Sequence, residues 1–154
     1  MKGGSYMRRS LIDILVHVVS TILLSTWVYQ KTGNLSYVAI LILTGIFLDL
    51  DHLIDYFIFF KNKFDLRALL EGLYLRSGKS YLIFHSWEIN FILLIFGLGL
   101  KFYPLNLFVL GSSMHLAIDN IQRKNRLFYF LIYRFYRKFD ALILLPEFKD
   151  KIGK

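Results

Sequence analysis

The residues of this sequence that could carry out chemistry are four histidines, each with a carboxylate three or four positions away. Residues at that spacing share one face of a helix, so each histidine and its acid would point the same way. The groups lie at four places along the chain and comprise Asp13 with His17, His52 with Asp49, Asp51 and Asp55, His85 with Glu88, and His115 with Asp119.

Imidazole and carboxylate groups together predict a divalent metal site. The chain has no cysteine, which excludes disulfides, thiolate zinc sites, iron–sulfur clusters and cysteine nucleophiles. Nitrogen and oxygen ligands without sulfur suit zinc, manganese or iron, and zinc is the first choice. The predicted ligands are His17, Asp51, His52, His85, His115 and Asp119, and the predicted catalytic carboxylates are Glu88, Asp49 and Asp51.

The composition predicts that these residues belong to a membrane protein. Of the 154 residues, 56% are hydrophobic, whereas a soluble domain is usually about 45–50% apolar. The apolar residues form blocks close to the roughly 20 residues that a helix needs to cross a ~30 Å hydrocarbon core. We therefore predict a single all-α integral membrane domain over 1–154, an antiparallel four-transmembrane-helix bundle with spans at 11–29, 35–52, 81–100 and 104–121.

The basic residues predict how this bundle is oriented. The formal net charge is +8, and of the 19 lysines and arginines only Lys31 and Lys101 fall in the loops after the first and third spans. The positive-inside rule makes the opposite side cytoplasmic, so both chain ends would face the cytoplasm from the inner membrane of the cell. When the chain is traced through the four spans, all four histidines fall in one layer near the cytoplasmic face.

Two further segments, 56–76 and 127–145, mix apolar, aromatic and basic residues. Charges in the middle of the second segment would be costly at the bilayer centre. We expect both segments to form helices in the cytoplasmic interface, with their cations toward anionic lipid headgroups. No recognisable nucleic-acid motif accompanies the basic charge, so we expect no nucleic-acid partner. Asp13 and His17 interrupt the first apolar block and no A-x-A site follows it, so we expect a retained span and no cleaved signal peptide.

The order of these motifs resembles a known family. After His17, the segments Asp49-Leu50-Asp51-His52, His85-Ser86, and His115 with Asp119 look like the D-x-D-H, H-S and S-H-x-x-x-D segments of small membrane-bound metal-dependent hydrolases of bacteria and archaea. The last motif departs from the family pattern, because Met114 separates Ser113 from His115. That family commonly has a second histidine in its middle motif, whereas this chain has His85 alone, with Glu88 as the candidate to replace the missing ligand. The resemblance implies a multi-span fold and hydrolase activity.

The expected function is a metal-dependent hydrolase. A bound zinc ion lowers the pKa of its water toward 7, and Glu88, Asp49 or Asp51 would act as the general base. A site at the cytoplasmic boundary could receive a membrane lipid or a lipid-linked ester or phosphoester, and nearby arginines and lysines favour phosphate. The alternatives are a metal-ion or proton transporter, a haem protein, and a non-catalytic membrane protein with a metal or polar core site.

Overall fold

The computed structural model describes residues 3–61 and 64–149, and its regular structure consists of helices. The all-α class predicted from the sequence is confirmed for these residues, whose one isolated antiparallel bridge joins Lys79 and Asp140. The α-helices are α1 (Gly3–Thr32), α2 (Leu35–Phe47), α3 (Asp51–Phe60), α4 (Leu66–Leu70), α5 (Trp87–Gly99), α6 (Tyr103–Gln122), α7 (Leu131–Tyr136) and α8 (Ala141–Leu144). Short 3-10 helices are η1 (Leu48–Leu50), η2 (Leu73–Ser77) and η3 (Pro146–Phe148).

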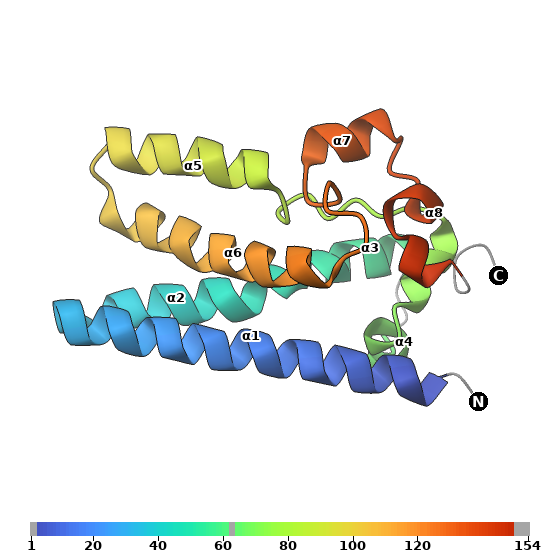
Figure 1. Ribbon diagram of the computed structural model, residues 1–154, viewed down its shortest axis with the longest axis horizontal. Coiled ribbons are helices and arrows are strands. Elements are labelled where there is room, and N and C mark those ends of the chain that lie inside the picture. The colour runs from blue at the N-terminus through green and yellow to red at the C-terminus, as the bar shows by residue number, and fades with distance from the viewer. Residues whose placement is uncertain (1–2, 62–63, 150–154) are drawn as a thin grey trace.

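Two helical hairpins form the body of the molecule (Figure 1). In the first hairpin α1 packs along α2, and in the second α5 packs along α6. Because α2 also packs along α6, the two hairpins are joined through these two helices. The turns of both hairpins lie at one end of the bundle, while the beginning of α1 and helices α4, α7 and α8 lie at the other.

The first hairpin reverses at Gly33 and Asn34. Gly33 has a left-handed φ of 64° and donates its N–H to the carbonyl of Tyr29 at 2.7 Å, which closes the end of α1. The Asn34 side chain accepts the N–H of Ser36 at 2.9 Å and so caps the start of α2. The chain therefore changes direction within two residues, as a tight antiparallel hairpin requires.

Two helical stretches of the described chain are long and apolar enough to cross a membrane. They are Leu11–Thr32 and the run Leu35–Phe60, which passes through α2, η1 and α3. The third predicted span is shorter than expected, because α5 has only 13 residues and is therefore about 20 Å long. The fourth, α6, has 20 residues but carries Asn106, Ser112 and His115 among its apolar residues. The structure thus gives two candidate spans, and the bundle of four spans stays a prediction.

Residues 81–86, predicted to begin the third span, form instead a non-helical linking segment between η2 and α5. Its backbone N–H groups bond to buried carboxylates of α3. Asp55 accepts the N–H of Tyr81 at 2.9 Å, and Asp51 accepts that of Phe84 at 2.7 Å. Charged side chains therefore replace the helical hydrogen bonds that this segment lacks.

The carbonyl groups of the linking segment bond to Arg134 of α7. Its guanidinium donates to the carbonyl oxygens of Tyr81, Leu82 and His85, the last at 2.8 Å. Arg134 is fully buried and lies over the ring of Phe128. The prediction that Arg134 would face lipid headgroups is therefore wrong, because its positive charge is used inside the protein to fix a backbone segment.

The two predicted interfacial helices are both divided. Segment 127–145 forms α7 and α8, and the chain reverses between them at Lys138 and Phe139, whose φ angles are 53° and 57°. Segment 56–76 is shared among α3, α4 and η2, and its residues 62 and 63 lie outside the described residues. These segments are held by a common hydrophobic core, which includes Tyr56, Ala68, Tyr74, Leu75, Phe128, Tyr129, Ala141 and Leu144.

Arg134→Ala should lower the free energy of unfolding by about 3 kcal/mol, because buried carbonyl oxygens would lose their donors. Thermal unfolding in detergent, followed by circular dichroism, measures this loss. Arg137→Ala removes the same charge from an exposed position nearby and should change the stability by less than about 0.5 kcal/mol. Equal effects of the two substitutions would show that Arg134 does not hold the linking segment.

Candidate metal centre

The four predicted histidines meet in one cluster, in which each ring lies near at least one of the others. His17 comes from α1, His52 from α3, His85 from the linking segment and His115 from α6. His17, His85 and His115 are buried, and His52 is partly exposed. Segments that are far apart in the sequence thus bring their imidazoles into one cluster.

Two imidazole nitrogens and two carboxylate oxygens form the centre of this cluster. Asp49 Oδ1 lies 3.3 Å from His115 Nε2 and 3.7 Å from His85 Nε2. Asp119 Oδ2 lies 3.6 Å and 3.9 Å from the same two nitrogens. Ligands 2.0–2.1 Å from a tetrahedral ion are about 3.4 Å apart, so these distances are close to those around a bound metal.

The two central nitrogens have a further property that fits a metal ion. Nε2 of His85 and Nε2 of His115 are both buried, and neither has a hydrogen-bond partner. A buried polar atom left without a partner is costly, so such atoms in a native protein call for an explanation. A cation between the nitrogens and the two aspartates would supply the missing interaction for both.

The other two histidines lie on either side of this centre. His17 Nε2 is 2.9 Å from Asp119 Oδ1, and the His17 ring stacks on that of His115 with their centroids 3.9 Å apart. His52 Nε2 is 3.9 Å from Asp49 Oδ1. The ligand atoms fall into two groups, each within 4.8 Å, either of which could hold an ion. One group is His17, His115 and Asp119, and the other is Asp49, His52 and His85.

Three of the histidines are oriented through their second ring nitrogen. Nδ1 of His85 lies 3.2 Å from Asp51 Oδ2, and Nδ1 of His115 lies 2.9 Å from the carbonyl oxygen of Gly45. Nδ1 of His52 lies 2.8 Å from the hydroxyl of Tyr74, and burial raises the pKa of that hydroxyl, which therefore stays protonated. Such bonds to the outer nitrogen fix the ring and leave Nε2 free for a metal, as in known metal sites.

The predicted ligand Asp51 has a different position from the one expected. Its side chain is 1% exposed, and Oδ2 accepts the backbone N–H groups of Phe84 and His85 as well as facing His85 Nδ1. Asp51 therefore orients the His85 ring, and neither of the two groups that could hold an ion includes it. Asp49 and Asp51 belong to the same four-residue motif, Asp49-Leu50-Asp51-His52, so the sequence could not tell which of the two points into the cluster.

The predicted catalytic residue Glu88 does not join the histidines. Its carboxylate accepts the hydroxyl of Ser86 at 2.7 Å and the backbone N–H groups of Leu131 and Ile132 at 2.9 and 3.0 Å. These two donors are at the first turn of α7, where a carboxylate is favourable because the N–H groups there have no helical partner. Glu88 thus caps α7, which in turn carries Arg134.

Tyr74, Gly45 and Arg134 are parts of the site that the sequence did not reveal. Tyr74 reaches His52 from η2, and the Gly45 carbonyl reaches His115 from another helix. The spacing of residues along the sequence does not predict such contacts, because they join residues far apart in the chain. Arg134 was the one signal in the sequence, because a charged residue is unexpected within the apolar segment 127–145. The structure explains it, since its guanidinium is buried and bonds to backbone carbonyl groups.

Comparisons of the chain with protein-family models, with curated proteins and with solved structures gave no match. The resemblance to membrane-bound metal-dependent hydrolases is therefore carried by the motifs of this chain alone. Its buried histidine and aspartate groups could hold a metal ion, and that statement follows from their geometry.

Tyr74→Phe should weaken divalent-metal binding by about tenfold to a hundredfold, which is the usual effect of removing a partner that orients a ligand. The substitution removes only the hydroxyl that contacts His52 Nδ1. Competition titration with a zinc chelator measures the affinity. Tyr29→Phe removes a hydroxyl at an exposed position near the far end of α1 and should leave the affinity unchanged. Equal affinities of all three proteins would remove His52 from the ligand set.

Proposed function

We propose that this protein is a divalent-metal-dependent hydrolase, with zinc as the ion, that acts on a lipid or lipid-linked phosphoester at the cytoplasmic face of the inner membrane. One observation carries the proposal. The unpartnered Nε2 atoms of His85 and His115 face two carboxylates in a buried cluster, with their outer nitrogens already bonded. The motif order of the membrane-bound metal-dependent hydrolases agrees with this reading.

His85, His115, Asp49 and Asp119 would hold the ion, with His17 and His52 beside it. A divalent ion bound there supplies Lewis acidity and a bound water with a pKa near 7. Hydrolysis also needs a group of the protein that can take the proton of that water.

Asp49 is the best general base in the cluster. Its side chain is 40% exposed, against 6% for Asp119, so it is the carboxylate that water and substrate can reach. All its contacts with the imidazoles use Oδ1, so Oδ2 can accept a proton. His52 is also partly exposed, and its Nε2 lies 3.9 Å from Asp49 Oδ1, so it can serve as a ligand beside Asp49. These roles replace the one predicted for Glu88.

Three properties of the chain support a membrane lipid as the substrate. Two of its helices are long and apolar enough to span a bilayer. In these stretches His17 lies six residues after Leu11 and His52 eight residues before Phe60, so both are on the side away from the turn at Gly33 that joins the two stretches. A phosphoester headgroup could therefore reach the cluster from the membrane surface, and the cationic side of the protein would attract anionic headgroups.

His115→Ala should reduce the metal content by more than about tenfold, because it removes a central ligand and the partner of the Gly45 carbonyl. Purified protein in detergent would be analysed by elemental mass spectrometry, and phosphate release would be followed on a panel of lipid phosphoesters. The wild type should retain at least one equivalent of zinc and release phosphate. The alanine variant should do neither.

Glu88→Gln is the matched control, because Glu88 holds α7 and not the cluster. It should keep its metal and lose only about 1 kcal/mol of stability, the usual effect of a weakened helix cap. Wild-type protein without metal would refute the proposal. Metal retention with ion uptake into proteoliposomes and no lipid turnover would support the transporter instead.

A further inference from the structure

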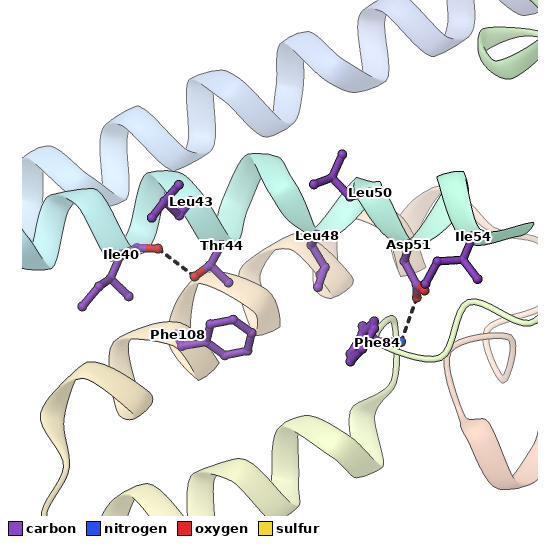
Figure 2. Close-up of a pocket in the computed structure, with 9 residues that line it drawn as sticks. All are labelled: Ile40, Leu43, Thr44, Leu48, Leu50, Asp51, Ile54, Phe84 and Phe108. Carbon is purple, nitrogen blue, oxygen red and sulfur yellow. Dashed lines mark hydrogen bonds between the residues drawn. The ribbon is translucent and has the colours of Figure 1, made fainter. Parts of the chain in front are cut away.

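An apolar groove lies beside the metal cluster, along one side of α2 and α3 (Figure 2). Its volume is about 630 Å³. It extends from Ile40 in α2 to Ile54 in α3, and Phe108 of α6 and Phe84 of the linking segment contribute its other side. With a rise of about 1.5 Å per residue, the groove is about 20 Å long.

The wall of this groove offers almost no polar contact. Thr44 is one of two polar residues that line it, and its hydroxyl already donates to the carbonyl of Ile40 at 2.7 Å. The remaining lining side chains are aliphatic or aromatic, apart from Asp51. An apolar surface of this kind is favourable for a hydrocarbon ligand and unfavourable for a charged one.

Asp51 connects the groove with the cluster. The same carboxylate that lines the groove near Phe84 also accepts from the backbone of His85 and faces its ring. Its other oxygen, Oδ1, is buried and has no hydrogen-bond partner. Asp51, which orients a central metal ligand, thus lines the groove one helical turn from its Ile54 end. A molecule lying in the groove with its polar end at Asp51 would have that end near the cluster.

The size of the groove decides between two kinds of occupant. A helix about 10 Å wide and of the same length would fill more than twice the volume, so a helix of a second copy does not fit. A single hydrocarbon chain does fit, and the candidate span Leu35–Phe60, which supplies most of the lining, would place it within the bilayer.

We propose that this groove binds one long hydrocarbon chain of a lipid whose phosphate group lies at the metal cluster. This inference rests on the proposed function and specifies its substrate as a single-chain phospholipid or a comparable lipid phosphate. Apolar walls match the chain, and a cation site beside Asp51 matches the phosphate, so the two regions together select an amphiphile.

Photo-crosslinking tests the proposal. The probe is a palmitoyl lysophosphatidic acid with a diazirine near the end of its chain, in phosphatidylcholine nanodiscs that contain the full chain. Labelled peptides are identified by mass spectrometry, and zinc content is measured on the same samples. The wild type should be labelled on α2 and α6 near Ile40 and Phe108, and excess unmodified lysophosphatidic acid should compete.

Ile40→Trp fills the groove at the end away from the cluster, and Ile42→Trp places the same side chain two positions further along α2, outside the groove. Exclusion of two methylene groups corresponds to about a tenfold loss of labelling, which is expected only for Ile40→Trp. Zinc content should be unchanged in both variants.

Equal labelling of the two variants, labelling without competition, or a crosslink between two protein copies at the groove would overturn the inference. Loss of zinc from the wild type, with labelling still confined to the groove, would refute the hydrolase proposal but leave the lipid site intact. Zinc retained without groove labelling would refute the lipid site but leave the hydrolase proposal intact.

Discussion

The rest of this site depends on the hydrogen bonds that the Asp51 carboxylate makes with the linking segment. This carboxylate is buried beneath the linking segment, where it binds two backbone N–H groups and orients the ring of His85. On the opposite side of that segment, the guanidinium of Arg134 binds the carbonyl groups. An anion and a cation thus hold a non-helical segment in an apolar environment, where unsatisfied backbone groups would be costly. His85 can face the other ligands only because both charges are present.

Much of the helical framework could be predicted from the sequence, since long apolar blocks and short polar breaks determine where helices begin and reverse. Gly33 and Asn34 mark such a break directly. The convergence of the four histidines could also be predicted, because hairpins of similar length return each ligand to the same level of the bundle. The span at 81–100 was wrong in its first six residues, since hydropathy cannot detect that carboxylates from another helix bind the backbone there.

The sequence predicted which types of residue form the candidate site, but it predicted the role of each residue less well. The sequence alone does not distinguish Asp49, Asp51 and Glu88, because each is an acid close to a histidine. The structure separates them by exposure and by partner: Asp49 is reachable, Asp51 is enclosed, and Glu88 is bound to α7. Tertiary contacts across many residues make this distinction, and no local pattern encodes such contacts. The division of 127–145 into α7 and α8 has the same origin, because packing around Arg134 overrides the periodicity of the segment.

The distribution of the ligands between the two hairpins has a consequence for assembly. His17, Asp49 and His52 belong to the first part of the chain, and His85, His115 and Asp119 to the second. A cation held by both parts acts as a cross-link between them, comparable to a disulfide that closes a long loop. If an ion binds at this cluster, its bonds would add to the packing of α2 along α6 that already joins the two hairpins. The stability of the contact between the two parts of the chain would then increase with the concentration of free metal in the cell.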